Sequence, residues 1–233
     1  MTSKICLMLG LAFGLVYGSL AWAGDAAPEA LHGKPAATGH PAAQHDKLGP
    51  PAPFVPMDPA VAIQKANAYF NQTASMIADF VQIGGDGRRA EGKIFIQKPG
   101  RLRFEYAAPA TLDIIADGTT VAVIDRKVGS MQQYFIWQTP LKFLLKADID
   151  LTRDVQILNV TSDPDNVAIL VEDKQVFGGP TRIKLMFDPA TFTLKQWEVT
   201  DPQGYETLVS LFNQDFTTKP DPAIFQLYQS SSK

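Results

Sequence analysis

Short segments rich in β-branched and aromatic residues recur from residue 77 to residue 213 at intervals of roughly ten residues, with turn signals between them. Clear turn signals are Lys98-Pro99-Gly100, Asp117-Gly118 and Asp201-Pro202-Gln203-Gly204. This spacing predicts an antiparallel sheet or barrel in a mainly β chain with a few helices, an α+β fold. We expect about eleven strands, at residues 77–84, 90–98, 101–107, 111–117, 119–126, 130–137, 154–162, 166–173, 180–188, 192–200 and 204–213.

Three helical segments interrupt or flank the strands, and each begins with a capping residue followed by proline. Asp58-Pro59 opens a helix over residues 59–73, in which Val61, Ile63 and Phe70, with the small Ala62 and Ala66, make an apolar face. Thr139-Pro140 opens a short helix over residues 139–146, and Asp221-Pro222 opens a short turn near the C-terminus. The first two helices are the only elements expected to cover the sheet.

Alternation along the strands predicts one apolar and one polar face, because successive side chains point to opposite sides. Leu102, Phe104 and Tyr106 share one face of their strand, and Arg101, Arg103 and Glu105 share the other. Ile94 and Ile96, and likewise Ile183, Leu185 and Phe187, extend the apolar face. Two interpretations stay open. The face is either the wall of a cavity sized for acyl chains beneath a small helical lid, or an ordinary packed core, which the pattern alone favours.

Lys98 has the same parity as Ile94 and Ile96, so its side chain is expected on the apolar face. A cation in that position needs a partner or a path to water. It either extends to solvent at the strand end or reaches main-chain carbonyls at the C-terminus of a lid helix.

The N-terminus has the order of a secretory signal peptide: Lys4, an apolar stretch from Ile5 to Leu20, and Ala21-Trp22-Ala23 as a cleavage site. A transmembrane anchor is the alternative, but the apolar stretch is short and no basic cluster follows it. We expect cleavage near Ala23 to remove residues 1–23, and we expect the protein to be exported to the periplasm. Cys6, the single cysteine, lies too early to carry a lipid after cleavage, and it excludes an intramolecular disulfide.

Residues 24–57 hold seven of the 17 prolines and few large apolar residues, which predicts a disordered linker before the domain at residues 58–229. The linker also contains all three histidines, His32, His40 and His45. Their spacing does not match a metal-ligand pattern, so no metal site is expected.

Composition and motifs argue against catalysis and against nucleic-acid binding. The formal net charge is −3 and the pI about 5.6, which gives no general attraction for nucleic acid. A Ser or Cys nucleophile needs a base, and every histidine lies in the predicted linker. Carboxylate pairs such as Asp148 and Asp150 fall in predicted turns, where acids are normally solvated. We therefore expect a binding protein without a cofactor rather than an enzyme.

The chain resembles the periplasmic outer-membrane lipoprotein carrier family, LolA. The resemblance starts with Phe80-Val81-Gln82, continues through the run from Gly92 to Tyr106 and Pro109, and includes Ile115-Ala116-Asp117-Gly118. Thr139-Pro140-Leu141 with Leu144 and Leu145 is similar to the lid segment of that family.

The resemblance implies an open, eleven-stranded half-barrel with a helical lid that binds the acyl chains of triacylated lipoproteins in transit. It implies an inner-membrane ATP-driven exporter and an outer-membrane acceptor as partners, with the chain acting as a monomer.

Leu102, Phe104 and Tyr106 match the cavity wall of that family. Lys98 matches a basic residue, typically Arg, that holds the lid closed. Lysine lacks the planar fork of arginine, so a weaker closure is expected. The alternative is a binding module of the same fold for another lipid, or a sensor of mislocalised lipoproteins.

Overall fold

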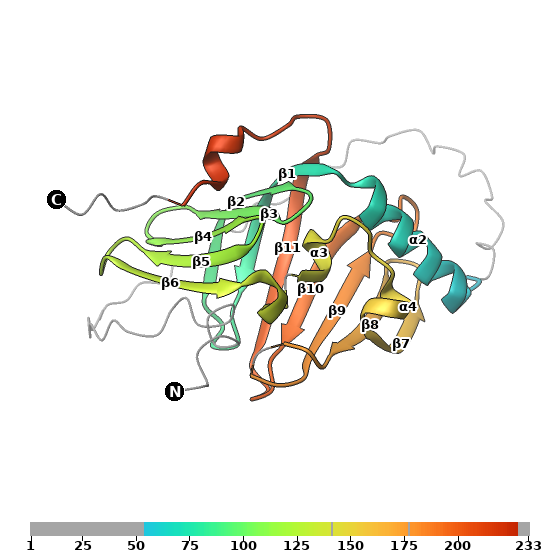
Figure 1. Cartoon of the computed structure of the whole chain (residues 1–233). Coiled ribbons are helices and arrows are strands. Elements are labelled where there is room, and N and C mark those ends of the chain that lie inside the picture. The colour runs from blue at the N-terminus through green and yellow to red at the C-terminus, as the bar shows by residue number, and fades with distance from the viewer. Residues whose placement is uncertain (1–53, 141, 177, 228–233) are drawn as a thin grey trace, which may run out of the picture. The chain divides into compact units, whose positions relative to one another are not determined.

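Eleven strands form one sheet in which every pair of neighbours is antiparallel (Figure 1). The computed structural model describes residues 54–140, 142–176 and 178–227, without the side chains of Phe143 and Leu144. The strands are β1 (Ser75–Ile83), β2 (Arg89–Gln97), β3 (Arg101–Tyr106), β4 (Leu112–Asp117), β5 (Thr120–Asp125), β6 (Ser130–Phe135), β7 (Gln156–Ser162), β8 (Val167–Asp173), β9 (Thr181–Phe187), β10 (Leu194–Thr200) and β11 (Glu206–Asp215).

The sheet consists of two meanders joined through its first and last strands. The strand order is β6-β5-β4-β3-β2-β1-β11-β10-β9-β8-β7, so β1 pairs with both β2 and β11. The edges, β6 and β7, do not pair with each other. The sheet is therefore open, and the prediction of about eleven antiparallel strands in an incomplete barrel is confirmed.

One face of the sheet is apolar, as the alternation predicts. In β3, Leu102, Phe104 and Tyr106 are buried, whereas Arg101 and Glu105 are exposed. In β9, Thr181, Ile183, Leu185 and Phe187 are buried on the same side. These side chains and those of the covering helices belong to one hydrophobic core.

The apolar face is covered mainly by α2 (Pro59–Gln72) and by the segment that carries α3 (Lys142–Leu145) and α4 (Leu151–Asp154) (Figure 1). The helix α2 begins as predicted, because the Asp58 side chain accepts hydrogen bonds from the backbone N–H groups of Ala60 and Val61. A 3-10 turn, η1 (Ile136–Gln138), precedes α3. Among the helices of the described residues, none is long and apolar enough to span a membrane.

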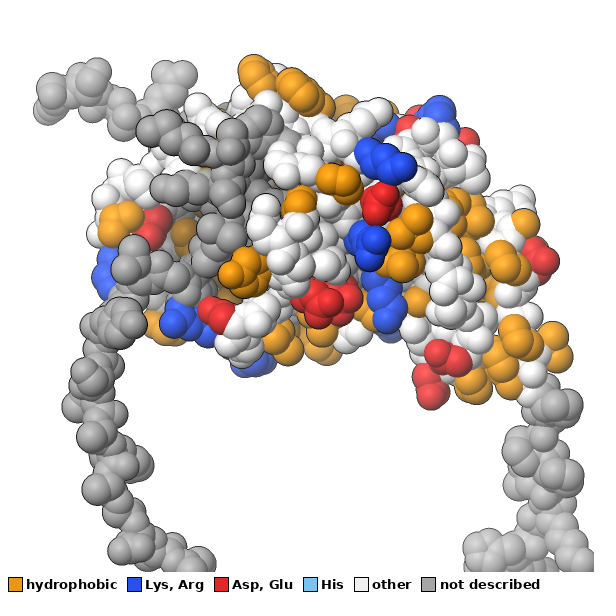
Figure 2. All heavy atoms as spheres, turned by 90° about the horizontal axis from the view of Figure 1, so that it is seen from below, with side chains coloured by type: hydrophobic (Ala, Val, Ile, Leu, Met, Phe, Trp, Pro, Cys, Tyr) orange, Lys and Arg blue, Asp and Glu red, His pale blue; other side chains and the backbone are white. Residues whose placement is uncertain are grey.

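The opposite face of the sheet is partly covered by the C-terminal 3-10 turn η2 (Pro222–Phe225), which Asp221 caps as predicted. Phe225 is buried, and Arg103 of β3 donates to the carbonyl oxygen of Ile224 at 3.4 Å. Side chains of both charges and scattered hydrophobic side chains lie on the face shown in Figure 2.

Most predicted elements are found within two residues of their expected bounds, but two differ. The second lid helix was expected over residues 139–146, whereas the structure has η1 and then the shorter α3. The helix α4 was not predicted. The expected signal peptide at 1–23, Cys6, the histidines and Leu141 lie outside the described residues, as does nearly all of the expected linker at 24–57.

Candidate functional site

The apolar face brings together all the side chains that were expected to form a cavity wall. Ile94, Ile96, Leu102, Phe104, Tyr106, Ile183, Leu185 and Phe187 are each at most 6% exposed. Four aromatic rings lie at its centre: Phe80 packs edge-on against both Phe104 and Tyr106 at 5.1 Å, and Trp197 lies 6.4 Å from Phe104. In this arrangement the wall residues are packed as a core. A ligand can therefore contact them only after the covering segments have moved.

A small apolar pocket remains where the C-terminal end of α2 approaches β10 and β11. Its lining includes Phe70, Ile96, Lys98, Trp197 and Leu211. The cavity volume is about 20 Å³, which is room for about one water molecule. The pocket marks a place where the covering helix and the apolar face meet loosely.

The inward face of α2 differs in part from the prediction. Ala62, Ala66 and Phe70 are buried, and Ile63 is partly buried against the core. Val61 is 42% exposed, so its assignment to the inward face is wrong. Each helical residue turns by about 100°, and the spacing of four from Ala62 through Ala66 to Phe70 places Val61 on the far side.

The second covering segment contributes Leu145, Ile149 and Leu151, all at most 2% exposed. Leu145 was expected here. Leu141 lies outside the described residues, and the side chain of Leu144 is likewise not described. Ile149 and Leu151 were not expected, because the segment after residue 146 was read as a loop.

Lys98 lies at the rim of the apolar face and contacts the C-terminal end of α2. Its ammonium group donates to the Phe70 carbonyl oxygen at 2.5 Å and lies 5.8 Å from the centre of the Phe70 ring. The sequence left two arrangements open for this side chain, extension to solvent or contact with carbonyls at the C-terminus of a lid helix, and the structure has the second. Burial lowers the pKa of Lys98 to about 8, because desolvation disfavours the charged amine.

The turn that carries Lys98 also holds α3. The backbone N–H of Gly100 donates to the Leu145 carbonyl oxygen at 2.9 Å, so one turn contacts the C-terminal ends of both covering helices. Gly100 has φ +75°, and a Cβ there would lie 2.7 Å from the Cα of Gly118. Only glycine fits this conformation and this close approach, which fix the turn against the β4–β5 connection.

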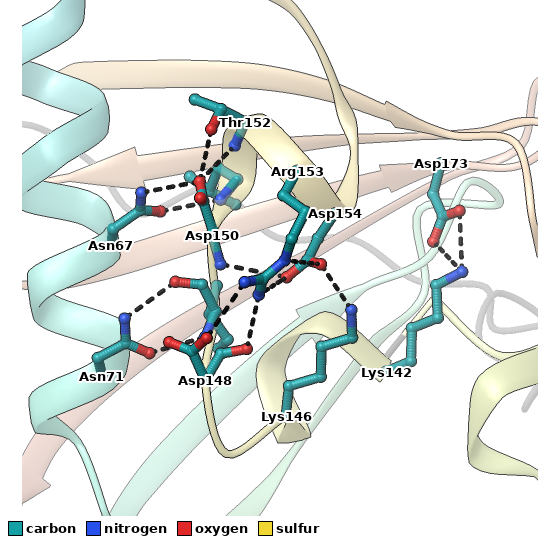
Figure 3. A network of polar contacts seen from close by, with 12 residues as sticks. Asn67, Asn71, Lys142, Lys146, Asp148, Asp150, Thr152, Arg153, Asp154 and Asp173 are labelled. Atoms are coloured by element: carbon teal, nitrogen blue, oxygen red, sulfur yellow. Dashed lines mark hydrogen bonds and ion pairs between the residues drawn. The ribbon is translucent and has the colours of Figure 1, made fainter.

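Two asparagines join α2 to the segment that leads into α4 (Figure 3). Asn71 Nδ2 donates to the Ile149 carbonyl oxygen at 2.9 Å, and Asn71 Oδ1 accepts from the Ile149 N–H at 2.8 Å. Asn67 Oδ1 accepts from the Leu151 N–H at 3.0 Å. The side chains satisfy backbone groups that no strand or helix uses, and they connect the two covering segments by hydrogen bonds. The spacing of four residues between the asparagines was the signal available in the sequence.

Charged side chains continue this network around α4 (Figure 3). Arg153 contacts Asp148 at 3.2 Å and Asp154 at 3.1 Å, and Lys146 contacts Asp154 at 2.8 Å. Burial alone would raise the pKa of Asp154, but the hydrogen bonds from Arg153 and Lys146 outweigh it and lower the pKa to about 2. Asp150, expected to be a solvated acid, caps α4 by accepting from the Thr152 N–H.

A buried ion pair ties α3 to the sheet. Lys142 Nζ lies 2.8 Å from Asp173 Oδ2 at the end of β8, and the two side chains are 10% and 2% exposed. Asp173 Oδ1 also accepts from the Gln175 N–H. Neither residue was singled out from the sequence, because nothing in the local pattern distinguishes them from surface charges.

The site has the chemistry of a closed apolar container. Within the described residues, no group of three or more His, Cys, Asp or Glu side chains is placed to hold a metal ion. The covering segments are attached through carbonyl contacts, amide pairs and ion pairs, which can break and form again without covalent change. Such a site can exclude water from apolar groups and expose them by a movement of its lid.

Comparison with known proteins identifies a matching family model and several relatives of this chain. The family model described as "Outer membrane lipoprotein carrier protein LolA" matches residues 71–228. An outer-membrane lipoprotein carrier protein from Chromobacterium violaceum is 24% identical over 173 residues, which cover 71% of this chain and 82% of the relative. One from Methylobacillus flagellatus is 31% identical over 77 residues, covering 31% of this chain and 38% of the relative.

Among solved structures, a LolA superfamily protein from Nitrosomonas europaea aligns with a TM-score of 0.42 and 13% identity. The alignment covers 72% of this chain and 97% of that protein.

Proposed function

The chain belongs to the LolA family of outer membrane lipoprotein carrier proteins, and on that premise we propose that it carries lipoproteins between membranes by enclosing their acyl chains. The observation that carries the proposal is the apolar face itself. Its wall residues are almost fully buried beneath covering segments that polar contacts hold in place. Opening those segments exposes apolar surface, and acyl chains can replace the lost core contacts.

The energetics favour binding once the lid is open. Burial of a methylene group contributes about 0.8 kcal/mol, so partial insertion of an acyl chain offsets the loss of several lid contacts. Each polar contact at the lid contributes only about 0.5–1.5 kcal/mol net. A carrier must also release its cargo, and a lid that closes again over the empty face favours release.

The proposal extends to the compartment and the partners. Export through a signal peptide at residues 1–23 would place the carrier domain, residues 58–229, in the periplasm, preceded by the Pro/Ala-rich linker at 24–57. There an inner-membrane ATP-driven exporter would supply triacylated lipoproteins, and an outer-membrane acceptor would remove them. In this proposal the chain acts by binding, as a monomer and without a cofactor.

The first test is native mass spectrometry with lipid extraction of the protein purified from its own periplasm. We expect triacylated lipoprotein to purify with it. A free phospholipid or another lipid instead would favour the alternative, a binding module of the same fold for a different lipid. A protein that is empty and also fails to bind a fluorescent acyl probe would overturn the proposal.

The second test addresses the control of the lid by Lys98. Lys98→Leu removes the contact with the Phe70 carbonyl and leaves the apolar side of β2 apolar. We expect this variant to fold and to show altered rates of cargo loading or release. Lys93→Leu is the matched control, because Lys93 lies on β2, shortly before the turn that carries Lys98, and forms an exposed ion pair with Asp79. Unchanged transfer kinetics in Lys98→Leu would contradict the role of Lys98.

A further inference from the structure

The strands β10 and β11 separate at the rim of the sheet. Their pairing runs from Thr200 and Glu206 to Gln196 and Ser210. Beyond that point β11 continues along β1, where Phe212 pairs with Asp79. A surface groove of about 520 Å³ lies between the separated ends. The end of the groove is bridged by Gln214, whose amide donates to the Leu194 carbonyl oxygen at 2.8 Å.

The groove is lined by amide and hydroxyl side chains and by two exposed aromatic rings. Gln196 donates to Ser210 at 2.9 Å, and Asn213 donates to Asp79 at 2.7 Å. An amide side chain has two donor hydrogens and an acceptor oxygen, so each keeps further hydrogen-bonding capacity. Phe212 and Phe216 are 50% and 41% exposed. This combination suits an extended polypeptide, whose amides need hydrogen bonds and whose side chains pack on aromatic rings.

The charge of the groove argues against a phosphorylated headgroup as its ligand. Lys195 is the one cation among its lining residues, and its ammonium group lies 3.8 Å from Asp188 Oδ2. Recognition of phosphate normally uses several cationic or backbone N–H donors that converge on one anion. The lining here favours a ligand with little net charge.

The groove lies next to the apolar pocket beneath α2, and the Gln214 side chain lies between the two. Leu211 lines both, and Leu194 of the pocket lies between Thr193 and Lys195 of the groove. The Tyr69 hydroxyl, which belongs to the pocket, donates to Gln214 Oε1 at 3.5 Å. Once the covering segments have moved, one ligand can place an apolar part on the inner face and a peptide part in the adjacent groove.

We propose that this groove binds the extended peptide that directly follows the lipid-bearing residue of a lipoprotein. The inference rests on the proposed carrier function and deepens it. The apolar face holds the acyl chains, and the groove between β10 and β11 holds the first peptide units outside the lid. The protein thereby distinguishes a lipoprotein from a free lipid with the same chains.

The experiment compares two ligands that share their acyl groups. One is tripalmitoyl-cysteine methyl ester, and the other is tripalmitoyl-cysteine extended by a short peptide of Ser, Asn and Gly. Each displaces a fluorescent fatty acid from the purified protein, and Kd is determined for both. We expect the peptide to strengthen binding about tenfold, the effect of one or two net hydrogen bonds.

Variants of groove residues test whether the gain in affinity for the peptide ligand arises in the groove. Phe212→Ala and Gln196→Ala are expected to lose most of the tenfold gain while keeping their affinity for the methyl ester. Met131→Ala on β6 is the control, because Met131 is 48% exposed and lies outside the groove. A gain that persists in both groove variants, or no gain in the unaltered protein, would overturn the inference and leave the carrier function intact. Failure of both ligands to displace the probe would instead contradict the carrier function on which the inference rests.

Discussion

The ammonium group of Lys98 is buried at the rim of the apolar face, so its charged form destabilises the folded state. Burial lowers its pKa from 10.5 to about 8. In the unfolded chain the amine keeps its ordinary pKa, so between about pH 8 and about pH 10.5 the unfolded state binds more protons than the folded state. Stability therefore rises with pH in this window. The cost of the buried charge is fully present below about pH 8.

The pH dependence can be isolated by comparing the unaltered protein with Lys98→Met. We expect the unfolding free energy of the unaltered protein, relative to that of Lys98→Met, to increase between about pH 7 and about pH 9.5. Urea denaturation at both pH values measures the difference, and other titrating groups cancel. Lys93→Met corrects for the loss of a lysine from β2, the strand that precedes the turn of Lys98. A relative stability that falls with pH would show that the contact with Phe70 outweighs the desolvation.

Single residues were predictable from sequence where strand parity or helix spacing determines them. The parity of β2 places Lys98 beside Ile94 and Ile96, which is what the structure shows. Parity does not determine which partner a long side chain reaches, so the sequence could not decide whether Lys98 contacts solvent or a helix carbonyl. Val61 was assigned wrongly because an apolar residue near the start of a helix can belong to either face.

At the scale of elements, α3 is attached to the sheet by the buried ion pair of Lys142 and Asp173. Lys142→Met leaves the Asp173 carboxylate buried without its cation, which costs about 3–5 kcal/mol of unfolding free energy. The double variant Lys142→Met/Asp173→Asn removes the charge and keeps an acceptor for the Gln175 N–H. We expect its loss to be below about 2 kcal/mol.

Chemical denaturation of the single and double variants tests this expectation. Recovery of stability in the double variant indicates that the cost of Lys142→Met is that of an unpaired buried charge. Equal losses in both variants would contradict this explanation and would point to lost packing of the Lys142 side chain instead.

The two covering segments are coupled through Asn71, which makes two hydrogen bonds to the backbone of Ile149. Asn71→Ala leaves both backbone groups without this partner, and we expect a loss of about 1–3 kcal/mol in unfolding free energy. Gln72→Ala, one position further along the same helix and exposed, is the control. Thermal or urea denaturation measures both. A loss no larger than that of the control would show that the Asn71 hydrogen bonds to Ile149 do not contribute measurably to the attachment of α2 to the α4 segment.

The strands were more predictable than the covering segments, for a physical reason. Strands such as β3 and β9 show a period of two within their own sequences, as in Leu102, Phe104 and Tyr106. The helix α4 has a single turn, too short to show a helical period, and its position depends on Asn67 and Asn71 from a distant helix. The contacts of Asn67 and Asn71 in Figure 3 join residues about eighty positions apart, which no local pattern reveals.

At the scale of the whole domain, the wall residues are nearly inaccessible while the covering segments are in place. Binding of an acyl chain therefore requires an opening step. If opening precedes binding, the observed rate rises with ligand concentration and then reaches a plateau equal to the opening rate. Lid movements of proteins occur in microseconds to milliseconds, and stopped-flow mixing with a fluorescent fatty acid resolves an opening step at the slow end of this range.

The plateau should respond to the contacts that hold the lid. We expect Asn71→Ala to raise the plateau rate, because its two hydrogen bonds to Ile149 must break before α2 separates from the segment leading to α4. Gln72→Ala should leave the plateau unchanged. An observed rate that rises linearly to the highest ligand concentration in all three proteins would mean that the acyl chain binds without prior opening. A plateau that Asn71→Ala leaves unchanged would mean that α2 and the α4 segment open together, with the amide pair intact.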